Sequence, residues 1–348
     1  MNPYVLTVLL SSLGLGTTLT FASSHWLLAW MGLEINTLAI IPLMAQQHHP
    51  RAVEATTKYF LTQATPAAMI LFAATTNAWV TGEWGISDMS HPVASSMTIA
   101  ALALKIGLAP MHFWLPEVLQ GLDLVTGLVL STWQKLAPLA LIIQVAPTVN
   151  PVMLTLLGLL STLVGGWGGL NQTQVRKILG YSSIAHMGWM IIISQYAPHL
   201  TLLALGMYVF MTSAAFLSLK MTSTTNIAAM TMMWSKAPVL VSTTALALLS
   251  LGGLPPLTGF MPKWLILQEM AKQQLPLTAT VMALAALLSL YFYLRLCYAM
   301  TLTISPNTTN AMTPWRARTT QSTITLALFM TTALGLLPIT PAIMSLVT

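Results

Sequence analysis

Apolar runs of roughly 20 residues recur along the whole chain, and only short polar connections separate them. A helix needs a run of that length to cross the hydrocarbon core of a bilayer. Charged residues make up 6% of the 348 residues, against about 25% in an ordinary soluble domain, so a soluble fold would have too little charge to cover its surface. The pattern predicts an all-α polytopic membrane protein, and the period-two alternation of a membrane barrel is absent.

We expect eleven transmembrane helices, joined by connections too short to hold a soluble domain. The spans are predicted at residues 3–23, 25–45, 58–81, 95–120, 124–146, 150–170, 177–196, 199–221, 237–261, 276–300 and 322–346. The longest connections are predicted at about 46–57, 82–94, 222–236 and 301–321. The whole chain, 1–348, is therefore predicted to form a single integral membrane domain. Within the sixth span, the run GGWGG at 165–169 predicts close packing against a neighbouring helix.

Basic residues are divided unevenly between the two sides that this topology defines. An odd number of spans puts the two termini on opposite sides, and the connections after the even-numbered spans share the side of the N-terminus. That side holds Arg51, Lys58, Arg176, Lys177, Lys220, Lys236, Arg316 and Arg318, and the other side holds Lys272. Because short loops rich in Lys and Arg stay on the cytoplasm-equivalent side, we expect the N-terminus there.

Several classes of site are excluded by the composition. The one cysteine, Cys297, excludes disulfide frameworks and cysteine-ligated zinc or iron–sulfur sites. No GxGxxG or Walker A sequence suggests a nucleotide or flavin fold, and no His/Glu spacing suggests a metal site. Although the net charge is +6, the basic residues form no stripe that could follow nucleic acid. The residues themselves therefore predict neither cofactor binding nor metal binding.

Two segments rich in Gly and Pro repeat one pattern 146 positions apart. GLAPMHFWLPE at 107–117 and GLPPLTGFMPK at 253–263 both read G-L-x-P, then five residues, then a second proline. Five spans separate the copies, so they have opposite orientations in the membrane. Paired breaks of this kind are typical of inverted-repeat transporters, with ordinary proline kinks as the alternative. We predict discontinuous helices in the fourth and ninth spans, broken at Pro110, Pro116, Pro255 and Pro256.

Five ionisable residues are predicted inside spans: Glu34, Lys105, Lys135, Lys263 and Arg295. Each costs roughly 2.5–3.5 kcal/mol at the bilayer centre, so a function is the first hypothesis for such residues. The alternatives are a protonated carboxyl at Glu34 and lysines that extend, or snorkel, to an interface. For Arg295, near the basic-side end of its span, snorkelling is the better interpretation.

The choice of lysine is informative about the chemistry. Burial and a nearby carboxylate act on an ammonium in opposite directions, so a lysine between them can load and release a proton. Arginine cannot, because it never deprotonates. The three buried lysines and Glu34 therefore predict a proton relay. His112, inside the first break, and His186 are weaker candidates, and a packed, hydrogen-bonded imidazole is the alternative for both.

Long segments of the chain also carry a resemblance. The chain resembles the antiporter-like proton-pumping subunits of respiratory complex I, the NADH:ubiquinone oxidoreductase, and within that family subunit 2 of the vertebrate mitochondrial type. The segments that carry it are MNP at 1–3, WMGLEINTLAIIPLM at 30–44, KYFLTQA at 58–64, KIGLAPMHFWLPEV at 105–118, WQKLAPL at 133–139, RKILGYSSIAHMGW at 176–189 and LGGLPPLTGFMPKW at 251–264.

The resemblance implies a fold and a set of roles. It implies an inverted repeat with two discontinuous helices, which matches the repeat found in the sequence, with halves at roughly 1–146 and 150–300 and a last span at 322–346. It implies a Glu34–Lys105 pair, a central lysine at Lys135 and a lysine at the second broken helix, Lys263. The bacterial relatives carry three further N-terminal helices, and this chain is expected to start without them.

The resemblance also implies a function. The chain is expected to translocate protons across the mitochondrial inner membrane as a non-redox subunit of a translocase, with its N-terminus in the matrix and its C-terminus in the intermembrane space. NAD, FMN, iron–sulfur clusters and ubiquinone would belong to the assembled complex. The partners would be other membrane-arm subunits and lipid, not nucleic acid, and the chain would not be a stand-alone monomer. A free-standing cation/proton antiporter and a structural membrane scaffold are the alternatives.

Overall fold

The computed structural model describes residues 2–46, 48–302 and 323–347, and the regular elements in those ranges are all helical. The helices of the first half are α1 (Pro3–Ala22), α2 (Trp26–Met44), α3 (Pro50–Thr81), α4 (Pro92–Ile106), α5 (Trp114–Gly121), α6 (Leu124–Ser131), α7 (Trp133–Val145) and the 3₁₀ turn η1 (Ala146–Thr148). Those that follow are α8 (Pro151–Gly168), α9 (Val175–Ser194), α10 (Pro198–Thr222), α11 (Ile227–Thr231), α12 (Met233–Lys236), α13 (Pro238–Gly252), α14 (Phe260–Lys272), α15 (Pro276–Thr301), α16 (Ile324–Gly335), η3 (Leu337–Ile339) and α17 (Thr340–Val347).

Six helical stretches among the described residues are long and apolar enough to cross a membrane. They are Pro3–Ala22, Trp26–Met44, Leu124–Thr148, Pro151–Gly168, Pro198–Thr222 and Pro276–Thr301. The bent pair Ile324–Gly335 and Leu337–Ser345, with 64° between its halves, makes a seventh if it is counted as one span. Long apolar helices of this number support an integral membrane protein.

Helix boundaries differ from the predicted spans in three places. Helix α3 begins at Pro50, well before the predicted start at 58, because His49 caps it and Pro50 occupies its first turn. The ninth span was predicted to end at 261, whereas α14 continues to Lys272. The predicted connection at 222–236 contains the short helices α11 and α12. Arg316 and Arg318 lie outside the described residues.

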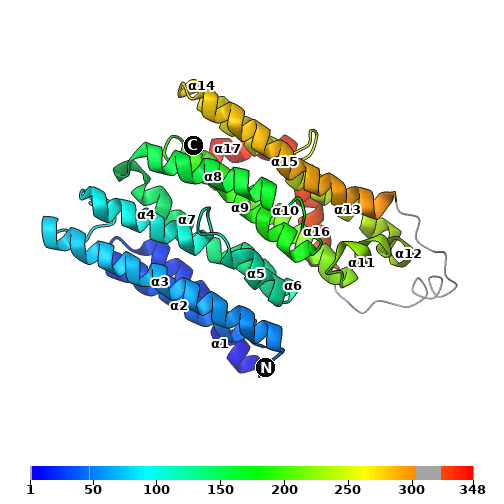
Figure 1. Cartoon of the computed structure of the whole chain (residues 1–348), viewed down its shortest axis with the longest axis horizontal. Helices are drawn as coiled ribbons and strands as arrows, with labels where there is room; N and C mark the ends of the chain where they lie inside the picture. Colours follow the sequence, from blue (N-terminus) through cyan, green and yellow to red (C-terminus); the bar gives the residue numbers. More distant parts are fainter. Residues whose placement is uncertain (1, 47, 303–322, 348) are drawn as a thin grey trace.

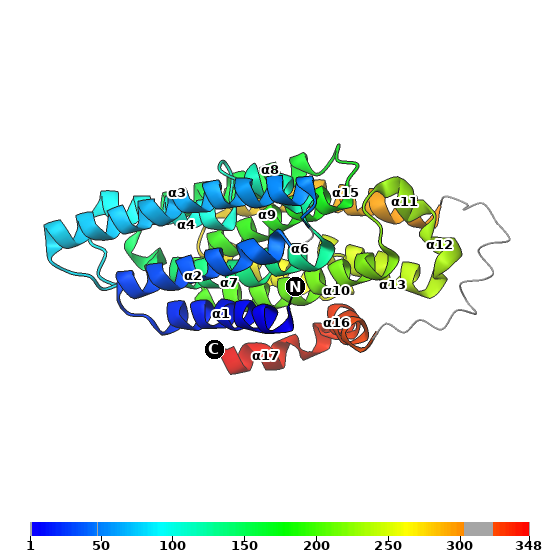
Figure 2. The ribbon, with the colours of Figure 1, turned by 90° about the horizontal axis from the view of Figure 1, so that it is seen from below.

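Helix α9 forms the axis of the bundle. Sixteen of its twenty residues are buried, as expected for a helix that other helices surround on all sides. Helices α5, α8 and α10 pack against it, and Figure 1 shows it near the middle of the molecule. Figure 2 shows α1, α16 and α17 along one face of the bundle. Side chains on α9 therefore project into the interior.

The packing of α8 against α9 confirms the expectation from the GGWGG run. A Cβ atom added at Gly165 would lie 2.6 Å from the backbone nitrogen of Ala185. Such a distance is far inside van der Waals contact, so the two backbones approach each other closely only because glycine has no side chain. This contact fixes the position of α9 beside α8.

The two Gly/Pro segments adopt the same backbone arrangement. After α4, Gly107 has a φ of +85° and its N–H donates to the carbonyls of Ala103 and Leu104. After α13, Gly253 has a φ of +80° and its N–H donates to Leu249 and Ser250. Both are left-handed helix caps, a conformation that favours glycine. The repeat in sequence is therefore also a repeat in local structure.

Further features recur at the same spacing in both segments. Cis peptide bonds precede Pro110 and Pro256, and the helices that follow begin at Trp114 and Phe260. Pro116 differs from the other predicted break residues because it lies in the first turn of α5. A proline there removes no helical hydrogen bond, since the first N–H groups of a helix have no partner within it. The chain therefore leaves helical geometry at 107–113 and 253–259.

Candidate functional site

Lys105 is buried and Glu34 is half-buried, and the two side chains do not reach each other directly. Lys105 lies in the last turn of α4 and is 6% exposed, and its Nζ atom has no hydrogen-bond partner. The Oε2 atom of Glu34, on α2, is also buried without a partner. The two groups interact electrostatically, yet no ion pair within 4 Å joins them among the described residues. They form a separated pair, whose members each have unused hydrogen-bonding capacity.

A small internal cavity lies between Lys105 and Lys135. Both lysines line it, together with Tyr59, Gln63 and Gln134. The cavity offers about 10 Å³ to the centre of a water molecule, which is close to the room that one water needs. A site of this size with several polar groups in its wall can bind a bridging water. The cavity therefore connects Lys105 to Lys135, the central lysine.

Lys135 is held by Tyr208, an uncharged residue that the sequence did not mark as a candidate. Lys135 is 2% exposed, and its Nζ atom donates a hydrogen bond of 3.3 Å to the Tyr208 hydroxyl. The same Nζ atom lies 5.2 Å from the centroid of the Tyr208 ring, within the range of a cation–π interaction. An aromatic hydroxyl inside the apolar run LLALGMYVFM was the available sequence signal.

The backbone of α6 and α7 is shaped around this contact. The N–H of Lys135 donates to Thr132, three residues back, at 3.3 Å. Ser131, four residues back, has a carbonyl that accepts the Tyr208 hydroxyl at 3.0 Å. The hydrogen bond from Lys135 thus spans three residues instead of four, and the Ser131 carbonyl remains free to accept the Tyr208 hydroxyl. In this arrangement the hydroxyl accepts from Lys135 and donates to Ser131.

His186 continues the line from Tyr208 towards the second break. Its ring centroid lies 5.5 Å from that of Tyr208. The charges of Lys135 and Lys263 both act on the imidazole electrostatically. The imidazole also forms a hydrogen bond with the backbone of Leu251, near the end of α13. An imidazole can carry a proton between its two nitrogens. His186 therefore lies between the central lysine and the second break.

Lys263 binds the backbone that the second break frees. It lies in the first turn of α14, and its Nζ atom donates a hydrogen bond of 2.8 Å to the Gly252 carbonyl at the end of α13. A Cβ atom added at Gly253 would lie 2.9 Å from Cδ of Lys263, so the lysine side chain runs directly over the glycine. Lys263 also lines a cavity of about 690 Å³, whose other lining side chains are mostly apolar.

The predicted relay residues thus separate into those that the structure brings together and one that it does not. Glu34, Lys105, Lys135, His186 and Lys263 follow one another through the bundle. The other histidine candidate, at position 112, contacts Pro110, Phe113 and Tyr181. None of those contacts, within the described residues, is with the three lysines.

Arg295 has a structural role. Its guanidinium donates hydrogen bonds to the backbone carbonyls of Leu170 and Gln172, in the connection between α8 and α9. It therefore fixes a loop at the end of the bundle. In the part of the chain that the structure describes, no group of three or more His, Cys, Asp or Glu side chains could hold a metal ion.

Comparisons with known families cover almost the whole chain. Residues 23–289 match the family described as NADH:quinone oxidoreductase/Mrp antiporter, TM. Residues 290–344 match the family described as NADH dehydrogenase subunit 2 C-terminus. The two matches are consecutive, so together they extend from residue 23 to residue 344, within the last predicted span.

Similar proteins agree with these matches. The chain is 80% identical over 346 residues to NADH-ubiquinone oxidoreductase chain 2 of Formosania lacustris, and the alignment covers 99% of each chain. It is 78% identical over 348 residues to the protein of the same name from Carassius auratus, over 100% of each chain. Among solved structures, a chain of respiratory complex I from Thermus thermophilus with bound aureothin is similar, with a TM-score of 0.81 and 29% identity over 96% of this chain and 80% of that one.

Proposed function

This chain belongs to the NADH-ubiquinone oxidoreductase chain 2 family, and from that premise we propose that it conducts protons as a membrane subunit of respiratory complex I. The single observation that carries the proposal is the line of buried and half-buried polar groups from Glu34 to Lys263. Charged side chains at membrane depth are costly, and they are retained where ions or protons move. The line crosses from one half of the chain to the other, as a conducting path requires.

The proton would move through this line in short steps. Lys105 and Lys135 exchange a proton through the water-sized cavity that they share. Lys135 then passes a proton to the Tyr208 hydroxyl, which must rotate away from Ser131 before it can donate towards His186. Each transfer breaks one N–H or O–H bond and forms another, so no redox group is needed in this chain. While the Tyr208 hydroxyl donates to Ser131, it cannot donate towards His186, so the proton path is interrupted until the hydroxyl rotates.

The proposal includes a finer topology than the long apolar helices alone establish. We propose eleven spans, in which α4 with α5 and α13 with α14 are the two discontinuous ones. The halves, roughly 1–146 and 150–300, would be related by inversion, followed by the last span at 322–346. The recurrence of left-handed glycine caps 146 positions apart supports this assignment. At the 146-residue offset Lys263 corresponds to Glu117 and Lys105 to Leu251, so the repeat preserves the break rather than the charge.

The proposed setting is the mitochondrial inner membrane. The N-terminus would face the matrix and the C-terminus the intermembrane space, in agreement with the uneven distribution of Lys and Arg. The partners would be the other membrane-arm subunits and lipid. NAD, FMN, iron–sulfur clusters and ubiquinone would be bound by other parts of the assembly.

Two other functions are weaker. A free-standing cation/proton antiporter would use the same fold, but the relatives over the full length are named as chains of an oxidoreductase. A structural scaffold would not need Lys105, whose unpartnered amine lowers the stability of the fold. Purification distinguishes a free-standing antiporter from a subunit of the complex, because a lone antiporter would not be recovered within a large NADH-oxidising complex.

The direct test is Lys135→Ala in the assembled complex, reconstituted in closed vesicles. Protons translocated per NADH oxidised should fall, while the complex still assembles. Lys220→Ala, a change of the same type at an exposed position at the end of α10, should leave the ratio unchanged. An unchanged ratio in the assembled Lys135→Ala complex would remove Lys135 from the conducting path.

A further inference from the structure

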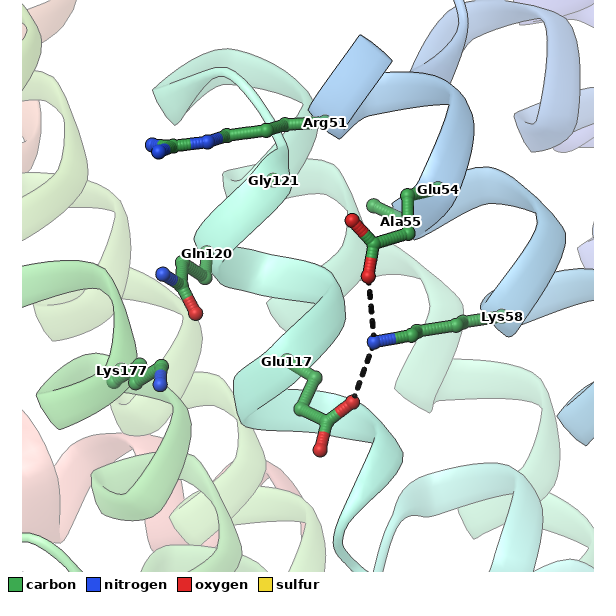
Figure 3. A pocket seen from close by; sticks show the side chains of 8 residues that line it. All are labelled: Arg51, Glu54, Ala55, Lys58, Glu117, Gln120, Gly121 and Lys177. Atoms are coloured by element: carbon green, nitrogen blue, oxygen red, sulfur yellow. Dashed lines mark hydrogen bonds and ion pairs between the residues drawn. The ribbon is translucent and has the colours of Figure 1, made fainter.

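A charged cavity of about 340 Å³ lies at one end of the bundle. Its charged groups come from three helices: Arg51, Glu54 and Lys58 from α3, Glu117 from α5 and Lys177 from α9 (Figure 3). We call this cavity the vestibule. Figure 1 shows that the N-terminus of the chain lies at the same end as the start of α3. The vestibule therefore lies on the side proposed to face the matrix.

One ammonium in the vestibule is shared between two carboxylates. Lys58 Nζ lies 2.9 Å from Glu54 and 3.0 Å from Glu117, so it joins α3 to α5 (Figure 3). Its hydrogen bond to Glu54 lowers the pKa of that carboxyl below its ordinary value. All three side chains are about half exposed or more. The site is thus open to water, and its two carboxylates can each accept a hydrogen bond from that water as well as from Lys58.

The vestibule lies one helical turn outside the cavity that Lys105 and Lys135 share. On α3, Ala55 lines the vestibule and Tyr59, four residues further, lines the inner cavity. On α5, Glu117 lines the vestibule and Trp114, three residues earlier, lines the inner cavity. Residues three and four apart lie on the same face of a helix. The two cavities are therefore stacked along the same pair of helices.

A layer of two aromatic rings separates the cavities. The rings of Tyr59 and Trp114 meet edge to face, with centroids 5.8 Å apart. Trp114 cannot relay a proton, because its indole N–H is a donor only and already donates to the Leu104 carbonyl at 3.1 Å. Tyr59 is 2% exposed, and a phenol can both accept and donate. Tyr59 also interacts electrostatically with Glu34.

We propose that the vestibule is the mouth through which this subunit takes up protons, and that Tyr59 is the group that admits them to the relay. This proposal rests on the proposed function. A hydronium ion in the vestibule gives a proton to the Tyr59 oxygen as the phenol's own proton passes inward to the neutral amine of Lys105, after that lysine has given its proton to Lys135. One O–H bond of the hydronium breaks and a new O–H bond forms at Tyr59, while the original Tyr59 O–H bond breaks and an N–H bond forms at Lys105. The hydronium becomes water and its positive charge moves to the ammonium, so atoms and charges balance.

The first experiment blocks the mouth from one side. Gln120→Cys introduces a thiol into the vestibule wall, and Val53→Cys introduces one at an exposed position of α3 that does not line it. A membrane-impermeant, positively charged thiol reagent is applied to either face of vesicles that contain the assembled complex. Reagent on the proposed matrix face should lower the protons translocated per NADH in Gln120→Cys and leave Val53→Cys unchanged. Complete modification of Gln120→Cys without loss, or equal loss from the opposite face, would overturn the proposal.

The second experiment removes the Tyr59 hydroxyl and keeps the ring. A positioned proton-transfer group contributes about 10²–10⁴-fold to the rate of its step, so Tyr59→Phe should lower the protons translocated per NADH in complex that assembles normally. Tyr298→Phe, on the exposed side of α15, is the matched control and should not change the ratio. If Lys135→Ala lowers the ratio and Tyr59→Phe does not, the proposed uptake through Tyr59 is wrong, whereas the proposed proton relay is supported. If Lys135→Ala itself has no effect, the proposed function fails.

Discussion

The ammonium of Lys135 is held by Tyr208 in two ways, through a 3.3 Å hydrogen bond to the hydroxyl and through the face of the ring, 5.2 Å away. Both residues are buried, and they come from α7 and α10, which are distant in the sequence. The Tyr208 hydroxyl also donates a hydrogen bond to the Ser131 carbonyl. In the proposed relay a single side chain would therefore both stabilise the central lysine and accept its proton.

Tyr208→Phe separates these two roles. The variant keeps the ring under the ammonium and removes the hydroxyl, which leaves the buried Lys135 amine and the Ser131 carbonyl without that partner, so the fold should lose about 1–3 kcal/mol for each group. Proton transfer from Lys135 should slow by about 100-fold or more, since the next acceptor is lost. The protons translocated per NADH, measured in vesicles, should fall. Tyr298→Phe serves as control, and equal ratios in the two variants would show that Tyr208 only positions Lys135.

Lys105→Met should impair pumping without lowering stability. The Lys105 amine is buried and has no hydrogen-bond partner, a situation that costs about 1–3 kcal/mol. Methionine fills a similar volume and removes that cost, so the variant complex should unfold at the same temperature as the parent or above it. A fall in the unfolding temperature would mean that a partner for the amine exists in the assembled complex.

Glu34 and Lys105 can be tested as a unit. They interact electrostatically across a gap wider than an ion pair, so each should influence the other's charge without a direct bond. Combining Glu34→Gln with Lys105→Met should then lower pumping no further than the worse single variant. Losses that simply multiply in the double variant would indicate two independent steps.

Gly253→Ala should disturb Lys263 through the backbone. The position has a φ of +80°, and its Cβ would meet the Lys263 side chain at 2.9 Å. The left-handed conformation costs a side chain about 1–2 kcal/mol, and the clash pushes the amine away from the Gly252 carbonyl. Assembled complex should accumulate less, with lower pumping per NADH. Gly206→Ala, within α10 with no atom inside 4 Å of the new Cβ, should be tolerated. Equal tolerance at both positions would contradict the role of Gly253.

The sequence predicts those parts of the site that depend on local chemistry. Gly107 and Gly253 were identifiable because a glycine and prolines in an apolar run mark a break at that place. The buried lysines were identifiable because charge is rare in spans. Both signals are contained in a few adjacent residues. No knowledge of packing is needed to read them.

The rest depends on contacts between distant segments. Tyr208 lies 73 positions from Lys135, and nothing near either residue reveals that they meet. Tyr59 looked like an ordinary aromatic of a span, yet it separates two cavities. His112 and His186 were equally good relay candidates from the sequence, because both are histidines within predicted spans. Only His186 lies on α9, the helix at the axis of the bundle. Polar groups without charge therefore need the fold before their roles can be distinguished.

Gly165→Ala tests whether close packing of α8 on α9 positions the relay. The new Cβ would lie 2.6 Å from the nitrogen of Ala185, and a backbone atom of a buried helix cannot move aside cheaply. Overpacking of this kind costs about 1–3 kcal/mol. The displacement also reaches His186, the next residue of α9, so pumping per NADH should fall together with the unfolding temperature. Gly14→Ala, in α1 with open space around its Cβ, should stabilise its helix slightly. A Gly165→Ala complex with a lower unfolding temperature and a normal pumping ratio would mean that the position of α9 tolerates a shift and that His186 is not in the path.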